Sequence, residues 1–423
     1  MSALGRGRAY AVIVGVCVLP RLAVLLHERG QILAEFVEKS DVMARVFVET
    51  GTFGYVPGEP SASTQPFYGW FLVAVYWIGG RNWIAIGTAQ ILVAAIAAVL
   101  VYETGRRYIS PRAGLLAALI WTVQPYLLWH DLHVNREIVD QPLGVAMFFL
   151  ALRAGETRSL PVAGALGLVT GLAVLSNSRL ALFPLVLGLY LVWRHAGWAA
   201  AALVPLMAAV AIAPWVVRNK VEVGCFTLTT DARALWKANN LNTLATLRAG
   251  GWIDDVPDLP NRPPTPSEVG DIYEQTGRRI PIDECAQQEY YQELVLEFWR
   301  EHPGEKAKLA AQATAMLWDP RVDLSGRTEG GGATAVARRW FEPAYMIPLV
   351  LLALAGLFAV VPSVRVLALT FLVYETAMAW IFVGTTRYRV PWDFVLALLA
   401  AAAIERWLSG WRPRWPRPFS QKR

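Results

Sequence analysis

Five ionisable side chains fall within the eight-residue stretch HDLHVNRE, between two apolar segments: His130, Asp131, His133, Arg136 and Glu137. Charged groups at the edge of a membrane domain are costly unless they are paired or functional. Histidines and carboxylates this close together resemble a metal-binding or acceptor-binding shell, but they also fit histidines at a helix end that carboxylates balance. Arg136 beside Glu137 is also typical of a local ion pair, so both interpretations stay open from the residues alone.

A further acid, Asp41, lies in the hydrophilic stretch Ser40–Trp70 that follows the first apolar segment. It precedes an amphipathic turn at Val42–Val48, then Gly, Pro and Ser residues and an aromatic return at Phe67–Trp70. An aspartate at such a place either caps a helix or serves as a general base. We favour the base, because the other polar clusters come out on the same side of the membrane.

Four arginines stand where apolar segments end: Arg179 in LSNSR, Arg218 in PWVVRNK, and Arg387 and Arg389 in TTRYRVPW. Arg179 and Arg218 lie at the level of lipid head groups, where arginine also serves as a snorkelling anchor. At the outer end of the last span, arginine runs against the positive-inside rule, and its fork of donors suits a phosphate. Arg387 and Arg389 would lie about 200° apart on a helix, so we expect only one of them to face a cavity.

The composition sets these residues in a membrane protein, since the 423-residue chain is 55% hydrophobic and only 17% charged. Its apolar segments approach the roughly 20 residues that cross a bilayer core, and a backbone in lipid must be helical. The sequence therefore predicts an all-α polytopic membrane protein. The ten predicted spans are Tyr10–His27, Trp83–Tyr102, Ala113–Trp129, Glu137–Leu152, Leu160–Ser176, Leu180–Val192, Trp198–Val217, Ala344–Val361, Val364–Val383 and Pro391–Trp407.

Basic residues in the short connections predict that the N-terminus lies in the cytoplasm. The aromatic segment Phe67–Gly79 is short, and counting it as a span would turn these basic connections outward, so we assign it to the membrane interface. The topology predicts a multi-pass protein of the plasma (inner) membrane whose polar clusters face outside. Membrane retention also explains the net charge of +6 better than nucleic-acid binding does.

The pattern predicts four parts: an N-terminal membrane domain (1–217) with a first external loop (28–66), an external segment (218–342), C-terminal transmembrane helices (343–408) and a basic cytoplasmic tail (409–423). The later part of the external segment has helical periodicity, with a break at Pro303–Gly304. One stripe of this helix is formed by Tyr291, Leu294, Val295 and Phe298. A disulfide between Cys225 and Cys285 fits an oxidising face, but their spacing does not decide it.

Together these patterns place carboxylates beside arginines at the outer membrane surface. Transfer of a sugar from a lipid phosphate to a hydroxyl acceptor needs this pairing, because a carboxylate deprotonates the acceptor while cations hold the leaving phosphate. A secondary transporter with intramembrane charges is the main alternative. A non-catalytic protein that binds lipid-linked sugar, of a flippase-like kind, is another.

The chain resembles the GT-C superfamily of polyprenyl-phosphate-sugar-dependent glycosyltransferases, in the branch of protein O-mannosyltransferases and aminoarabinose transferases. The matching features include Asp41, the run from Ala44 to Gly51 and the segment QPFYGWFLVAVYWIGG. Further matching segments are GTAQILVAAIAAVLVYETGRR, PWVVRNKVEVGCF, EFWREHPGEKAKL and TTRYRVPW. They are spread over nearly the whole chain, so the resemblance predicts a GT-C-like bundle with a small external helical segment.

The resemblance implies an inverting transferase that acts on the external face with a polyprenyl-phosphate sugar as donor. By position, Asp41 would be the base, Glu137 a second acid, and Arg387 a contact to the lipid phosphate; Arg179 and Arg218 are further candidates for that contact. The family often has an acid directly after the loop aspartate, where this chain has Val42, so a metal-bridged loop is in doubt. No cofactor is assigned, and a divalent metal and the identity of the acceptor stay open.

Overall fold

The structure, a computed structural model, describes residues 5–34, 37–321 and 333–410. Within these residues all regular secondary structure is helical, apart from one isolated bridge between Val56 and Glu59. This confirms the predicted all-α class. Most of the expected cytoplasmic tail, from residue 411 onward, lies outside the described residues.

The first half of the chain alternates long apolar helices with short ones. Its elements are α1 (Arg6–Glu28), α2 (Ser40–Thr50), α3 (Pro66–Gly79), α4 (Trp83–Tyr108), α5 (Pro111–Thr122), α6 (Pro125–His130), α7 (Glu137–Thr157), α8 (Leu160–Ser176), η1 (Ser178–Leu180), α9 (Phe183–Trp193) and α10 (Trp198–Glu222). The helices α4 and α5 begin at side-chain caps, where Asn82 and Ser110 accept from backbone N–H groups of the first turn. Gly51 ends α2 with a φ of 77°, a conformation that glycine adopts without strain.

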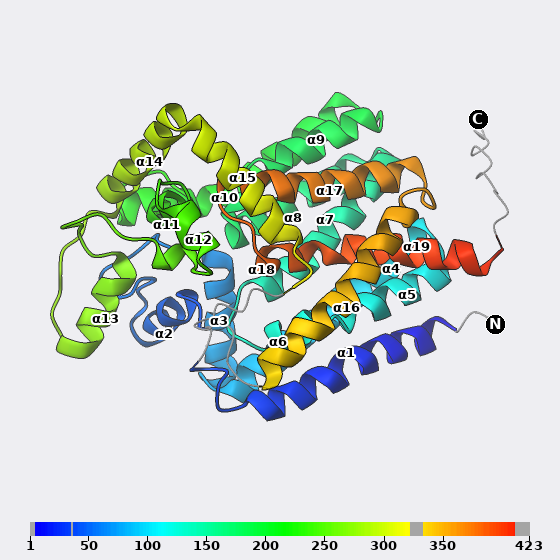
Figure 1. Ribbon diagram of the computed structural model, residues 1–423, viewed down its shortest axis with the longest axis horizontal. Helices are drawn as coiled ribbons and strands as arrows, with labels where there is room; N and C mark the ends of the chain where they lie inside the picture. The colour runs from blue at the N-terminus through cyan, green and yellow to red at the C-terminus, as the bar shows by residue number, and fades with distance from the viewer. Residues whose placement is uncertain (1–4, 35–36, 322–332, 411–423) are drawn as a thin grey trace.

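The predicted external segment (218–342) and the C-terminal helices complete the chain. The external segment holds α11 (Ala232–Lys237), α12 (Thr243–Arg248), η2 (Ile253–Asp255), α13 (Pro266–Thr276), α14 (Glu284–Glu301) and α15 (Pro303–Trp318). The C-terminal elements are α16 (Ala333–Gly356), α17 (Pro362–Ile381), α18 (Thr386–Arg389), η3 (Val390–Trp392) and α19 (Asp393–Leu408). Figure 1 shows α11, α12, α13 and α14 gathered at one end of the bundle, beside α2.

Small residues allow the bundle helices to approach closely. A Cβ added at Gly171 of α8 would lie 2.7 Å from the carbonyl oxygen of Ala208 in α10. Gly105 of α4 and Gly114 of α5 meet in the same way, with 2.6 Å between an added Cβ and the facing Cα. Such contacts take the place of hydrophobic driving force between helices in lipid. These close approaches pack α8 against α10 and α4 against α5.

Five described helices are long and apolar enough to cross a membrane: α1, α4, α7, α10 and α17. The segments Pro66–Gly79, Leu160–Ser176 and Ser178–Trp193 are apolar but shorter. The expected single span Ala113–Trp129 is wrong, because α5 ends at Thr122 and α6 begins at Pro125. Proline lacks an N–H and holds Gln124 in an extended conformation (ψ 126°), so it ends the helix. The count of ten spans stays a prediction.

The predicted external segment has the helix break and the buried stripe that its local sequence predicts. The helix breaks between Glu301 and Pro303, as expected, and Tyr291, Val295 and Phe298 are buried along one stripe. Cys225 and Cys285 form a disulfide that ties the residues after α10 to the start of α14. The structure therefore contains the disulfide that the spacing of the two cysteines did not decide.

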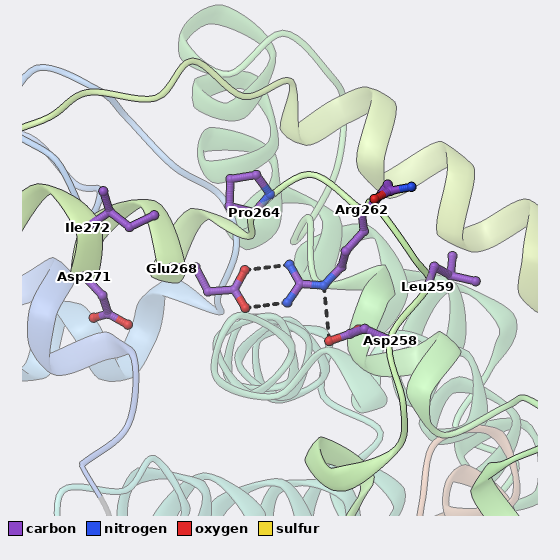
Figure 2. A pocket seen from close by; sticks show the side chains of 8 residues that line it. Asp258, Leu259, Arg262, Pro264, Glu268, Asp271 and Ile272 are labelled. Carbon is purple, nitrogen blue, oxygen red and sulfur yellow. Dashed lines mark hydrogen bonds and ion pairs between the residues drawn. The ribbon is translucent and has the colours of Figure 1, made fainter.

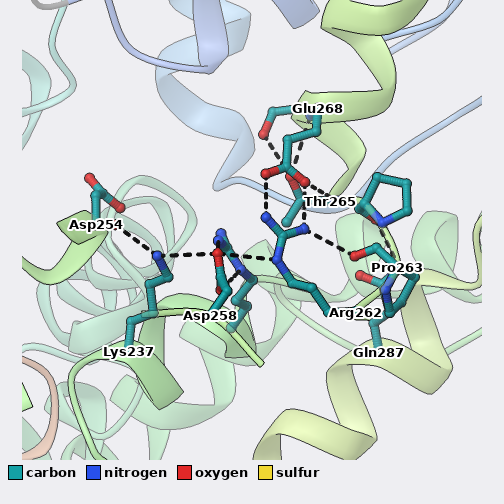
Figure 3. Close-up of polar contacts among 11 residues, drawn as sticks. Lys237, Asp254, Asp258, Arg262, Pro263, Thr265, Glu268 and Gln287 are labelled. Carbon is teal, nitrogen blue, oxygen red and sulfur yellow. Dashed lines mark hydrogen bonds and ion pairs between the residues drawn. The ribbon is translucent and has the colours of Figure 1, made fainter. Parts of the chain in front are cut away.

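A network of ion pairs organises the loop before α13 in the external segment. The Arg262 guanidinium forks onto both carboxylate oxygens of Glu268 (2.5 and 2.6 Å) and also contacts Asp258 at 3.1 Å. These side chains line a shallow pocket of about 740 Å³ (Figure 2). Asp258 also pairs with Arg233 and with Lys237, whose ammonium donates to the carbonyl of Asp254 (Figure 3). Each nitrogen of the Arg262 guanidinium thus has a partner within the protein.

Candidate active site

The central contact of the candidate site joins Glu137, the first residue of α7, to Arg387 of α18. Arg387 Nε donates to Glu137 Oε1 at 2.7 Å, although 250 residues separate the two in sequence. The Glu137 side chain is 2% exposed, whereas that of Arg387 is 30% exposed. The pair therefore has a buried acid and a cation that is open on one side.

Glu38, two residues before α2, completes a square of charges around this pair. Its carboxylate lies 3.5 Å from Arg387 Nη2 and 3.7 Å from Arg136 Nη1, and it accepts from the backbone N–H of Arg136 at 3.0 Å. Arg136 Nε lies 3.9 Å from Glu137, and its Nη1 donates to Gln65. Two carboxylates thus alternate with two arginines, from three segments far apart in sequence.

Burial and charge act against each other in this square. Burial raises the pKa of Glu38 above its usual value, although the Arg136 and Arg387 cations oppose that shift. Burial alone would lower the pKa of Arg387, but the carboxylates of Glu137 and Glu38 raise it well above its usual value. Arg387 is therefore cationic at every physiological pH, as a phosphate-binding residue must be.

His130 faces Glu137 from the end of α6. Its Nε2 lies 4.0 Å from Glu137 Oε2, and its ring stacks on Tyr126 with 5.0 Å between centroids. Neither ring nitrogen of His130, nor Glu137 Oε2, nor Asn135 Nδ2 has a hydrogen-bond partner within residues 5–34, 37–321 and 333–410. Burial lowers the pKa of His130 to about 3, so this imidazole is neutral. Unpartnered buried polar atoms are rare in native proteins, and here they gather in one connection.

Asp41 lies on α2 one turn beyond Glu38 and is 2% exposed. Arg81 holds both of its carboxylate oxygens, with contacts at 3.0 Å to Oδ1 and 2.8 Å to Oδ2, and the Tyr76 hydroxyl donates to Oδ1. The alternative that Asp41 caps the helix is wrong, because α2 begins at Ser40 and Asp41 lies inside its first turn. Asp41 is instead an ion-paired carboxylate whose partner Arg81 is 35% exposed.

Two other residues of the HDLHVNRE stretch have structural partners. Asp131 accepts from Arg21 Nε and Nη2 (2.9 and 2.7 Å) and from Gln141 (2.6 Å), so it binds α6 to α1 and α7. The ring of His133 packs on Trp129, and its Nδ1 lies 2.9 Å from the carbonyl oxygen of Trp129. In the part of the chain that the structure describes, no three His, Cys, Asp or Glu residues are grouped to hold a metal ion. The metal alternative gains no support from the arrangement.

The remaining arginines divide between the site and the scaffold. Arg179 stacks on Tyr388, the residue beside Arg387, with 3.4 Å from its guanidinium carbon to the ring centroid. Arg218 donates to the carbonyls of Ser61 and Phe53 and pairs with Glu222, so it anchors the loop before α3. Its phosphate role stays a prediction without a contact to the square.

The two arginines of TTRYRVPW lie on the short helix α18 and not on the last helix, α19. Arg389 is 2% exposed and faces the end of the predicted external segment. Its guanidinium donates to the carbonyls of Leu317 and Asp319 and pairs with Asp393. Arg387 and Arg389 do point to different surroundings, as their spacing predicted.

Sequence reasoning missed Glu38, Arg81 and Gln65. Glu38 lies three residues before Asp41, in the predicted first external loop (28–66), and this proximity was the available signal. Nothing local distinguishes Arg81 or Gln65, because their partners are 40 and 71 residues away in sequence.

The site contains groups suited to two kinds of substrate, one that carries a phosphate and one that carries a hydroxyl group. Arg387, with Arg136 beside it, offers charge-assisted donors to an anion. Glu137 and Asp41 offer carboxylates that can accept a proton.

The family model described as dolichyl-phosphate-mannose-protein mannosyltransferase matches residues 60–217. The GT-C resemblance is confirmed. The match covers α3 to α10, and so includes Glu137, Arg136 and His130, while Glu38, Asp41 and Arg387 fall outside it. No curated protein sequence matches the chain.

Among solved structures, the archaeal oligosaccharyltransferase AglB from Archaeoglobus fulgidus, in complex with an inhibitory peptide and a dolichol-phosphate, matches with a TM-score of 0.53 and 12% identity. The match covers 94% of this chain and 50% of AglB, so the chain spans about half the length of that relative. It shows a shared GT-C fold.

ArnT from Cupriavidus metallidurans also matches, in a structure bound to undecaprenyl phosphate and in the apo state. The TM-scores are 0.42 and 0.39, with 14% and 15% identity. These matches cover 96% and 95% of this chain, and 79% and 78% of ArnT.

Proposed function

We propose that this GT-C-like protein transfers a sugar from a polyprenyl phosphate to a hydroxyl acceptor. The single observation that carries the proposal is the placement of Arg387, which pairs with the buried Glu137 and with Glu38 while it stays 30% exposed. A cation that is fixed by two carboxylates and open on one side suits a ligand that brings its own negative charge. The dolichol-phosphate in the AglB complex supports a lipid phosphate as that ligand.

In this proposal, Arg387 and Arg136 bind the donor phosphate. The phosphate oxygens accept from the guanidinium groups and compete with Glu38 for them, since the 3.5 and 3.7 Å contacts of Glu38 are looser than the 2.7 Å contact of Glu137. As the bond between the sugar C1 and the phosphate oxygen breaks, both electrons go to that oxygen. Cations held beside it stabilise this charge without reorganising.

Asp41 is the proposed base and Glu137 the second acid. The acceptor hydroxyl gives its proton to a carboxylate while its oxygen bonds to C1, on the face opposite to the leaving phosphate, which inverts the configuration. Arg81 Nη2 lies 2.8 Å from the Asp41 carboxylate. Arg81 is the partner that has to move to admit an acceptor, and it is the exposed member of the pair.

We further propose a plasma (inner) membrane location, with this site and the external segment facing outside. The five helices that can cross a membrane support membrane insertion, while the orientation rests on the basic connections.

The proposal is tested with purified protein in vesicles that contain polyprenyl-phosphate mannose, the donor type suggested by the family name. Release of polyprenyl phosphate that depends on an added hydroxyl acceptor supports it. Glu137→Gln should slow that release by about 10²-fold or more. If the wild-type protein binds the lipid but releases no sugar with a panel of peptide, glycan and lipid acceptors, the non-catalytic alternative replaces the transferase.

A further inference from the structure

Two facing polar atoms at the base of the site lack partners. Glu137 uses only Oε1 for Arg387, and its Oε2 points at His130 Nε2 across 4.0 Å. Both side chains are 2% exposed, and neither atom has a hydrogen-bond partner in the described part of the chain. Leaving such buried polar atoms unpaired is unfavourable, so their position calls for a ligand atom.

The 4.0 Å separation allows one hydroxyl oxygen to contact both atoms. An oxygen placed about 2.8 Å from each atom would sit in hydrogen-bonding range of both. A hydroxyl can donate its proton to the carboxylate and accept from the imidazole N–H at once, which matches these two groups. The neutral state of His130 leaves one ring nitrogen protonated and free to donate.

We infer that His130 and Glu137 form a hydroxyl-binding subsite, which rests on the proposed transferase function and adds a specificity element to it. The hydroxyl belongs either to the donor sugar or to the acceptor. Glu137 Oε1 contacts Arg387. A hydroxyl bound at Oε2 would therefore lie on the other side of the same carboxylate group from the phosphate-binding cation.

The ring of His130 is fixed by packing rather than by hydrogen bonds, because Tyr126 stacks on one face and Trp129 packs at 6.3 Å between centroids. A ring held in this way keeps its place when its nitrogens lose their function. The substitution His130→Phe should therefore preserve the packing while it removes the donor. His130→Gln restores a donor in the same region.

The test measures binding of two lipids to detergent-solubilised protein, polyprenyl phosphate alone and polyprenyl-phosphate mannose, and then measures transfer. His27→Phe, at an exposed histidine near the end of α1, is the matched control. We expect His130→Phe to lower transfer by about ten- to hundred-fold, with partial rescue by His130→Gln, while binding of the bare lipid phosphate is unchanged. Arg387→Lys should weaken binding of both lipids.

The arms separate the two sources of the hydroxyl. If it belongs to the donor sugar, His130→Phe abolishes the extra affinity for the mannosyl lipid. If it belongs to the acceptor, the variant raises the acceptor KM and leaves the binding of both lipids unchanged. A His130→Phe variant that transfers sugar at the wild-type rate overturns the subsite. The subsite is also overturned if His130→Phe and His130→Gln lose transfer equally and both lose binding of bare polyprenyl phosphate. A wild-type protein that transfers no sugar contradicts the proposed function instead, and the acceptor source is then excluded with it. In that case, loss of the extra affinity for the mannosyl lipid in His130→Phe still supports the subsite, and an unchanged affinity overturns it.

Discussion

Arg387 and Glu137 meet at 2.7 Å between the short helix α18 and the first turn of α7. This contact links the HDLHVNRE connection to the TTRYR connection, the two polar segments that the sequence placed on one side of the membrane. Because Glu137 is buried and Arg387 is partly open, the pair presents a cation to the surface and an acid behind it.

The two arginines of α18 should respond differently to substitution by lysine. Arg387→Lys keeps the charge but loses the planar fork, so we expect a donor KM raised by about ten-fold with unchanged thermal stability. Arg389→Lys leaves buried carbonyls of Leu317 and Asp319 without their donors and should lower stability by about 2 kcal/mol. A donor titration and a thermal melt of each variant measure the two effects. Equal donor KM values in the two variants would remove the phosphate role from Arg387.

Asn239 should be a major determinant of how the external segment attaches to the membrane helices. This fully buried amide donates to the carbonyls of Leu235 and Ile381, and its oxygen accepts from Trp299 and Lys306. We expect Asn239→Ala to lower stability by about 2 kcal/mol or more, because several buried groups lose partners. The exposed Asn242→Ala is the control. Thermal melts that coincide for the two variants would contradict this role.

Local patterns predicted the elements, while the partners of the charged side chains required the fold. The break at Pro303 and the buried stripe through Tyr291 could be predicted because proline geometry and helical periodicity act over a few residues. The break before Pro125 carried the same signal, but the apolar residues around it favoured a continuous span.

The partners of the charges were not predictable, because they depend on which connections the bundle brings together. Asp131 was grouped with His130 and His133 by sequence, yet its partner is Arg21 of α1, 110 residues away. Glu38 has no local motif and gains its place through Arg136 and Arg387, which are far away in sequence. Sequence therefore located the polar connections, and the packing of α1, α7 and α18 decided which side chains converge.

The ion pair between Arg262 and Glu268 should make the α13 loop sensitive to acid. Hydrogen bonds from Arg262 lower the pKa of Glu268 to about 2, below its ordinary value of about 4.3. A depressed carboxyl pKa contributes stability that is present above the unfolded-state value and is lost as the pH falls from about 4.3 towards 2. Hydrogen exchange of residues 258–276 should increase over this range. Arg262→Gln should weaken protection already at neutral pH and flatten the dependence; an unchanged profile in this variant would show that the pair does not stabilise the loop.

Cysteine labelling tests the proposed orientation. Asp271→Cys, exposed on α13, should react with an impermeant thiol reagent added to intact cells, whereas Ser409→Cys at the end of α19 should react only after permeabilisation. The native background is quiet, because Cys17 is buried and the other two cysteines are paired. The reverse labelling pattern would place the candidate site in the cytoplasm.

The most direct measurement of the central claim is single-turnover sugar transfer by Asp41→Asn in vesicles with polyprenyl-phosphate mannose. Asparagine preserves the shape of Asp41 but cannot take a proton, so the account predicts a rate lowered by about 10² to 10⁴ with unchanged binding of the donor lipid. Arg81→Gln is the control for loss of the ion pair alone, and its rate should fall far less. Near-wild-type transfer by Asp41→Asn, or an equal loss in Arg81→Gln, would contradict the assignment of Asp41 as the base.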